Sequence, residues 1–156
     1  MKITVGGDHA SPMLKKRVVE ELRSLGHDVS DIGAFSEESV DYPDFAAKVA
    51  RDVSAGKVDR GVLICGTGIG MSIVANKFPG VRAAVVHDLF TAEVSRSHND
   101  ANILCLGARV LTEDEGAAIV RKWIDLPPDG GRHKRRVEKI LRIEADLQND
   151  SRPCRP

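Results

Sequence analysis

The chain has 156 residues, of which 42% are hydrophobic, a size and composition that fit one compact domain with a sizeable core. Lysine plus arginine and aspartate plus glutamate both total 23, so no net charge directs the protein to nucleic acid or to an anionic membrane, and any anion site must be local. The apolar runs are too short for a membrane span and the N-terminus lacks a signal-peptide core, so we expect a soluble, cytoplasmic protein.

Strands and helices alternate along the chain. Residues 2–7 form a β-rich run that ends in two glycines, and Ser11-Pro12 then provides an N-cap and a first-turn proline for a helix that reaches Leu25 and closes at Gly26. Four more strands are expected at residues 28–32, 61–65, 83–86 and 103–106.

A helical stretch follows each of these strands. The helices begin after Tyr42-Pro43, after the glycines at positions 66, 68 and 70, after the fourth strand, and at Thr112, where Glu115 completes a capping box. Repeated βα units with apolar central strands favour a parallel sheet covered on both faces. The expected fold is therefore a doubly wound, three-layer α/β/α sandwich with a five-stranded parallel, Rossmann-like sheet.

The C-terminal part is a separate helix and a short tail. After Pro127-Pro128 and Gly130-Gly131 a helix is expected over residues 132–147, with basic first turns and an apolar stripe. Residues 151–156, which include Cys154, hold two prolines and no apolar anchor, and are expected to be a disordered tail. We therefore predict a single domain at residues 1–150.

Polar residues cluster where strands end, and this is where open α/β sheets bind ligands. Three strands end in Asp8-His9, in Cys65-Gly66-Thr67-Gly68-Ile69-Gly70 and in His87-Asp88. The glycine loop opens a helix and could hold a phosphate or an oxyanion. It could also be a dinucleotide-binding turn, with Asp88 suitably spaced but Met71 in place of the third glycine, or simply a tight turn.

Several reactive side chains have both functional and structural interpretations. Cys65 precedes a helix N-terminus, which favours a thiolate, yet a cysteine is also a common core residue, as expected for Cys105. The three cysteines form no CxxC pair, which disfavours a disulfide framework and a cysteine-rich zinc site. The basic and imidazole side chains that could line a cleft or simply face solvent are His9, His98, Arg132 and Arg136.

Taken together, seven segments resemble the B-type ribose-5-phosphate isomerases, a family that also includes galactose-6-phosphate and allose-6-phosphate isomerases. The match covers nearly the whole chain. With Cys65 present and Met71 where one branch has a glutamate, the chain resembles the cysteine branch. The segments are Gly7-Asp8-His9-Ala10, Tyr42-Pro43-Asp44, Cys65-Gly66-Thr67-Gly68-Ile69-Gly70-Met71-Ser72, Asn76-Lys77, His98-Asn99-Asp100-Ala101-Asn102, Gly107-Ala108-Arg109 and Gly131-Arg132-His133.

The resemblance implies an aldose–ketose isomerase of the pentose phosphate pathway that works through a cis-enediolate. It makes Cys65 the base, His98 the group that opens the sugar ring, and Thr67 a helper in proton exchange between O1 and O2. It implies no metal and no cofactor. The residues expected to bind the sugar, its phosphate or the enediolate are Asp8, His9, Tyr42, Gly66, Gly68, Ile69, Gly70, Asn99, Arg109, Arg132 and Arg136.

Two alternatives to ribose 5-phosphate isomerisation stay open on the sequence. One is the same reaction on allose 6-phosphate, galactose 6-phosphate or a free aldose. The other is a non-catalytic module that binds a phosphosugar or nucleotide, although a binder needs no proton shuttle.

The position of the last helix predicts a homodimer or a larger homo-oligomer. Because the helix before it runs back along the sheet, Arg132 begins on the side opposite Cys65, and the five residues 127–131 would have to stretch almost fully to return across the sheet. We therefore expect Arg132 and Arg136 to complete the active site of a partner subunit.

Overall fold

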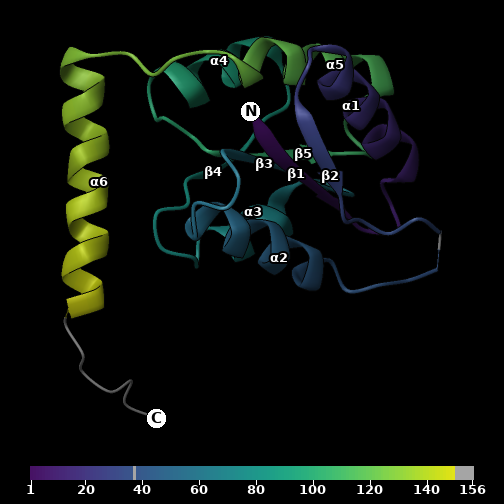
Figure 1. Ribbon diagram of the computed structural model, residues 1–156, viewed down its shortest axis with the longest axis horizontal. Helices are drawn as coiled ribbons and strands as arrows, with labels where there is room; N and C mark the ends of the chain where they lie inside the picture. The colour runs from purple at the N-terminus through teal and green to yellow at the C-terminus, as the bar shows by residue number, and fades with distance from the viewer. Residues whose placement is uncertain (37, 150–156) are drawn as a thin grey trace.

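The computed structural model describes residues 1–36 and 38–149, and its ribbon is drawn in Figure 1. The expected order of strands and helices is confirmed. The second to fifth strands each differ from the expected bounds by one residue at one end. Helix α3 begins at Ile69, so Gly70 lies inside its first turn rather than before it. The expected tail at 151–156, with Cys154, lies outside the described residues, and the single domain at 1–150 stays a prediction. The elements are β1 (Lys2–Gly7), α1 (Pro12–Ser24), β2 (Asp28–Asp31), α2 (Tyr42–Ser54), β3 (Arg60–Cys65), α3 (Ile69–Ala75), β4 (Ala83–Val85), α4 (Leu89–Ser97), β5 (Ile103–Gly107), α5 (Glu113–Ile124) and α6 (Gly131–Asn149).

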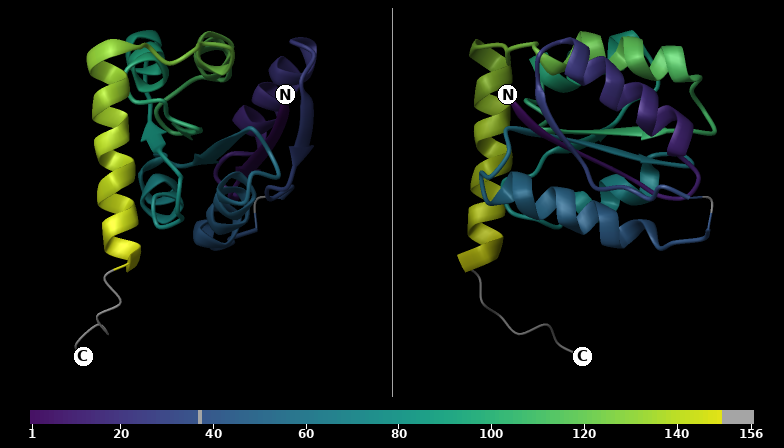
Figure 2. Two further views of the ribbon diagram at one scale, coloured as in Figure 1. Left: turned by 60° about the vertical axis from the view of Figure 1, so that its left-hand side comes forward. Right: turned by 45° about the vertical axis from the view of Figure 1, so that its right-hand side comes forward.

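The five strands form one parallel sheet in the order β2-β1-β3-β5-β4. Helices α1, α4 and α5 cover one face and α2 and α3 cover the other, as Figures 1 and 2 show. This confirms the doubly wound, three-layer sandwich. Because β3 lies at the centre, and Cys65 at its end pairs with Gly107 of β5, the cysteine reaches the middle of the carboxyl edge of the sheet.

Alternation along β3 divides the core between the two faces. Val62 and Ile64 pack in the cluster under α1 and α5, whereas Leu63 and Cys65 pack in the cluster under α2 and α3. Both clusters are built from side chains that are almost completely buried. The strand therefore fixes the face on which the Cys65 thiol emerges.

The start of α1 differs in detail from the expectation. Ser11 occupies the N-cap position, but its hydroxyl makes no cap hydrogen bond and donates instead to the carbonyls of Asp8, at 2.9 Å, and Ile64, at 3.1 Å. The Thr112–Glu115 capping box of α5 is confirmed. Ser11 therefore ties the loop after β1 to the end of β3.

Helix α6 stands apart from the sandwich (Figures 1 and 2). None of its residues is buried, and its apolar side chains Ile140, Leu141, Ile143 and Leu147 are exposed. A carboxylate oxygen of Glu144 accepts a hydrogen bond of 2.8 Å from the backbone N–H of Gly80. Within residues 1–36 and 38–149 no helix combines the length and apolar character needed to cross a membrane.

Candidate active site

The loop after β1 brings Asp8 and His9 to the carboxyl edge of the sheet. Asp8 is buried, and one of its carboxylate oxygens accepts a 2.9 Å hydrogen bond from the N–H of Ala10. The Nδ1 atom of His9 accepts a 3.2 Å hydrogen bond from the N–H of Val40. In this tautomer Nε2 carries the proton, so the ring can donate a hydrogen bond to a ligand.

Cys65 ends β3 with only 5% of its surface exposed. Its Sγ accepts a hydrogen bond from the N–H of Gly68 at 3.2 Å. Gly68 caps α3 with φ of +80°, and a Cβ there would lie 3.2 Å from the backbone of Cys105 and Leu106. Only glycine suits both this conformation and this close approach, so Gly68 is what allows a backbone donor to face the thiol.

Two of the loop glycines are covered by side chains that sequence analysis assigned to the site. A Cβ on Gly70 would lie 2.5 Å from Cζ of Tyr42, so the phenol ring rests on the first turn of α3. A Cβ on Gly66 would lie 3.4 Å from Cδ and Nε of Arg109. The glycines therefore let Tyr42 and Arg109 lie directly against the loop that follows Cys65.

Thr67 lies at the turn of the same loop, against Gly107 at the end of β5. A Cβ on Gly107 would lie 2.9 Å from the Thr67 backbone, and the Thr67 hydroxyl accepts a long, 3.4 Å hydrogen bond from the N–H of Ile69. We name this group the Cys65 edge; it comprises Asp8, His9, Tyr42, Cys65, Thr67 and Arg109.

Cys105 is a core residue, as the sequence suggested. It is fully buried, and burial, with a smaller contribution from the nearby Cys65, raises the pKa of its thiol. A thiol that resists ionisation is a poor base. Of the two cysteines in the described residues, Cys65 is therefore the one placed for chemistry.

A hollow of about 670 Å³ opens at the same edge, beside the Cys65 loop. Its wall includes His9 and Arg109 together with the first turns of α1 and α5. His9 and Arg109 suit an anion such as a phosphate, whereas the carboxylates of Glu113 and Asp114, which also line the hollow, oppose one.

His98 and Asn99 lie at the opposite edge of the sheet. His98 is the C-cap of α4, and Asn102, just after this turn, donates a 3.1 Å hydrogen bond to the carbonyl of Arg82, where β4 and β5 are about to begin. From Ile103 to Gly107, strand β5 advances by four residues along the sheet, a distance of ~13 Å. Within one chain, His98 is therefore separated from Cys65 by the length of the sheet.

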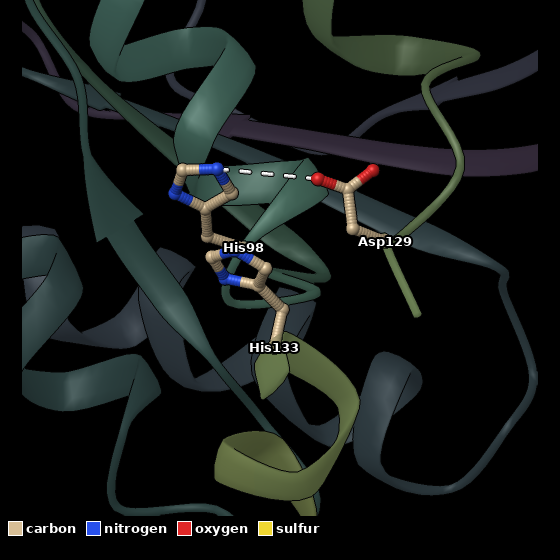
Figure 3. Close-up of side chains that lie close together, drawn as sticks. All are labelled: His98, Asp129 and His133. Atoms are coloured by element: carbon tan, nitrogen blue, oxygen red, sulfur yellow. Dashed lines mark ion pairs between the residues drawn. The ribbon is translucent and has the colours of Figure 1, made fainter. Parts of the chain in front are cut away.

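His98 belongs to a cluster with Asp129 and His133, drawn in Figure 3. The two imidazole rings stack with centroids 3.9 Å apart and an angle of 18° between their planes, and a carboxylate oxygen of Asp129 lies 3.9 Å from Nε2 of His98. Partial loss of hydration, together with the neighbouring His98 and Arg132, lowers the pKa of His133. The surroundings of His133 therefore disfavour its protonated form.

This cluster offers three metal-ligand atoms within 4.8 Å of one another. An imidazole lone pair lies in the plane of its ring, and two nearly parallel planes 3.9 Å apart do not meet at a common ion. The observed arrangement of the two rings is therefore not suited to binding one metal ion.

Arg132 and Arg136 extend from the first turns of α6, beside this cluster, and both are exposed. Arg132 Nε lies 3.1 Å from Nε2 of His133. We name the second group the His98 edge; it comprises His98, Asn99, Arg132, His133 and Arg136. Sequence reasoning gave no role to Asp129 or His133, and no spacing between position 98 and positions 129 and 133 signals that they meet.

A family model described as Ribose/Galactose Isomerase matches residues 3–140. The chain belongs to the ribose/galactose isomerase family. Members similar to it include "Ribose-5-phosphate isomerase B" of Escherichia coli (strain K12), 47% identical over 143 residues that cover 92% of this chain and 96% of that protein. "D-erythrulose-4-phosphate isomerase" of Pectobacterium atrosepticum is 40% identical, covering 90% and 93%.

The solved structure of Clostridium thermocellum ribose-5-phosphate isomerase B is 50% identical and superposes with a TM-score of 0.90 over 94% of this chain and 99% of that one. The resemblance to this isomerase family and its sandwich fold, both inferred from the sequence, are therefore confirmed.

Proposed function

We propose that this member of the ribose/galactose isomerase family interconverts D-ribose 5-phosphate and D-ribulose 5-phosphate, with Cys65 as the base. The observation that carries the proposal is the thiol at the end of the central strand, hydrogen-bonded by Gly68 N–H at 3.2 Å. The relatives of similar length that are named ribose-5-phosphate isomerase B support this choice of substrate.

The proposed chemistry is a proton transfer between neighbouring carbons. The Cys65 thiolate removes the proton from C2 of the open-chain aldose, which leaves a cis-enediolate, and then returns a proton to C1. Thr67 lets a proton pass between O1 and O2. Backbone N–H groups of the loop at 66–70 stabilise the negative oxygen, so this step uses no metal or organic cofactor.

The sugar and its phosphate are assigned to both edges. Asp8, Tyr42 and Asn99 hold hydroxyl groups, and His98 exchanges the proton that opens the ring. Phosphate is held by His9, Arg132 and Arg136, with Arg109 a further ligand. Because the two edges of one chain lie a sheet length apart, we propose a homodimer in which the His98 edge of each chain meets the Cys65 edge of the other.

A subunit-mixing experiment tests this shared site. Two inactive proteins, Cys65→Ala and Arg132→Ala/Arg136→Ala, are unfolded and refolded together with different affinity tags, so that heterodimers can be isolated. Each heterodimer then contains one intact site of two, so random equal pairing should give about a quarter of wild-type activity in the mixture and about half in the isolated heterodimer. Heterodimers no more active than the separate mutants would show that both edges serve their own chain.

Four-carbon sugar phosphates are a second candidate substrate class, because the relative named D-erythrulose-4-phosphate isomerase matches nearly the whole chain at 40% identity. Steady-state kcat/KM for four-carbon aldose phosphates, for ribose, allose and galactose phosphates and for free sugars ranks these substrates. Ribose 5-phosphate should rank first. A reduced Cys65 is essential to the proposal, and a reducing compartment such as the cytoplasm maintains it.

A further inference from the structure

The turn that carries His98 and Asn99 is held in an unusual backbone conformation. Asp100 has φ of +47°, in the left-handed region that side chains other than glycine rarely adopt. Its carboxylate is fixed by two guanidinium groups, with Arg96 Nη1 at 2.6 Å and Arg82 Nη2 at 2.9 Å. A conformation of this kind persists only where surrounding contacts enforce it.

Arg96 has a second set of contacts that Arg82 lacks. Its Nε and Nη2 donate to the carbonyl of Leu126 at 3.3 and 3.2 Å, and Nη1 also donates to the carbonyl of Ala101 at 2.7 Å. Leu126 begins the linker from α5 to α6. Arg96 therefore joins this linker to the turn that contains Asp100.

The linker is also fastened at its other end. The N–H of Asp129 donates a 2.7 Å hydrogen bond to the carbonyl of Ser97, directly before His98. Arg96 is only 3% exposed, and its guanidinium lies over the ring of Trp123 with Cζ 5.8 Å from the centroid. A buried guanidinium that donates four hydrogen bonds therefore lies between the two segments that form the His98 edge.

We propose that Arg96 is the positioning residue of the His98 edge, setting the turn with His98 and Asn99 and the start of α6 in one fixed relation. The inference rests on the proposed function, in which this edge enters the partner's active site. Arg96 touches neither substrate nor partner in this scheme. Its contacts fix the positions of His98, Arg132 and Arg136 relative to one another when they enter the partner's active site.

Arginine is the side chain this task requires. Its planar group presents five N–H donors in fixed directions, so it can bind Asp100, Ala101 and Leu126 simultaneously. A lysine keeps the charge but offers one ammonium group that cannot span the two segments. Displacement of a catalytic group by about 1 Å can cost roughly 100-fold in rate.

The first measurement is the kinetics of Arg96→Met with ribose 5-phosphate, with Arg82→Met as matched control. Arg96→Met should lose roughly 100-fold in kcat/KM, with lower kcat and higher KM, because both the imidazole and the arginines are displaced. Arg82→Met removes the contacts to the carboxylate and the carbonyl of Asp100, at 2.9 and 2.8 Å, but leaves the linker contacts intact, so its KM should rise much less than that of Arg96→Met. Equal changes in KM for the two variants would overturn the inference.

The second measurement assigns the defect to one edge by complementation. Refolded together, Arg96→Met and Cys65→Ala should regain about a quarter of wild-type activity, since the heterodimer has one site with an intact Cys65 edge and an intact His98 edge. Arg96→Met with Arg132→Ala/Arg136→Ala should regain none, because both variants damage the same edge.

The outcomes separate the inference from the proposed function. Failure of the reference pair, Cys65→Ala with Arg132→Ala/Arg136→Ala, would reject the shared site itself. If that pair complements and Arg96→Met with Cys65→Ala does not, the positioning role is wrong. Far-UV circular dichroism monitors folding, because Arg96 lies over the ring of Trp123 and its loss would change tryptophan fluorescence directly. Should Arg96→Met not fold, Arg96→Lys enters the same two pairings with the same expected results.

Discussion

Cys65 and Cys105 are chemically identical side chains in different settings. Both face the α2 and α3 side of the sheet, but Cys105 is enclosed within β5, whereas Cys65 ends β3 and meets a backbone donor. Position along the strand, rather than residue type, therefore separates the proposed base from a packing residue. The pair supplies a matched comparison for mutagenesis.

Cys65→Ala should lower kcat by ~100-fold or more, since general-base catalysis is typically worth that much. Substrate affinity, measured by isothermal titration, should change little, because the base acts on the transition state. Cys105→Ala should keep its activity and lose only folding stability. More than about a tenth of wild-type kcat in Cys65→Ala would exclude the thiol as the base.

His98→Asn should impair ring-forming substrates selectively. A four-carbon aldose 4-phosphate cannot close a ring, so C2 proton exchange in that compound should be much less affected than turnover of ribose 5-phosphate. Exchange is followed by deuterium incorporation from D2O. An equal loss on both compounds would show that His98 does something other than open the ring.

At the scale of helices and strands, the sequence was sufficient for every element that depends on local signals. The Thr112–Glu115 capping box and the closure of α1 at Gly26, with φ of +83°, are examples. Long-range contacts escaped prediction. The Ser11 hydroxyl donates a hydrogen bond to the carbonyl of Ile64, 53 residues away, and Arg96 Nε donates one to the carbonyl of Leu126, 30 residues away. Neither spacing matches the period of a helix or a strand.

The candidate site shows the same difference between residues with a local sequence signal and residues brought together by long-range contacts. In the Cys65 edge, Asp8, His9, Cys65 and Thr67 lie at or just after strand ends and could be found from topology, whereas Tyr42, at the start of α2, and Arg109 came from the family resemblance. His133 and Asp129 could not, because their proximity to His98 depends on the path of the linker, which Arg96 and the Ser97 carbonyl determine.

Contact between α2 and α3 should set the position of the Tyr42 hydroxyl. In Gly70→Ala the new Cβ would lie 2.5 Å from the Tyr42 ring, so the ring must move and KM should rise several-fold. In a Tyr42→Ala background the same Gly70→Ala change should have little further effect on KM, because its collision partner is gone. Full additivity of the two changes would contradict this contact.

Helix α6 should dimerise through its apolar stripe. Ile140→Asp/Leu141→Asp places charge on two half-exposed apolar residues and should yield monomers by analytical ultracentrifugation, with activity lost in parallel. The circular dichroism spectrum should change little, since none of the α6 side chains is buried in the sandwich. Glu138→Gln, on the same helix, is the control and should stay dimeric. An active monomer would disprove the shared site.

Across the whole molecule, a buried carboxylate joins the first and last helices of the sandwich. Glu21 of α1 is 3% exposed and accepts hydrogen bonds from Arg17 at 3.0 Å and from Arg121 of α5 at 2.7 Å. Burial alone would raise the pKa of Glu21, but the hydrogen bonds from the two arginines outweigh it and lower that pKa below its ordinary value of 4.5.

The lowered pKa predicts an acid-sensitive contribution to folding. The charged Glu21 stabilises the fold fully above about pH 4.5, and this contribution is lost as the pH falls further through the folded-state pKa. Glu21→Gln should cost about 1–3 kcal/mol at pH 7, and the difference from wild type should shrink below that pH range. Urea titrations at several pH values measure it, with the exposed Glu20→Gln as control. A difference independent of pH would refute it.

The sheet length between Cys65 and His98 also has a consequence for how the protein responds to its own abundance. In the proposed shared-site dimer, a chain whose two edges cannot meet is inactive when alone, so catalytic capacity follows the number of dimers rather than the number of chains. Below the dissociation constant of the pair, halving the amount of chain quarters the total activity. Above it, activity becomes proportional to the amount of chain. If the site is shared as proposed, the spacing across one small sheet sets the protein concentration above which turnover becomes proportional to the amount of chain.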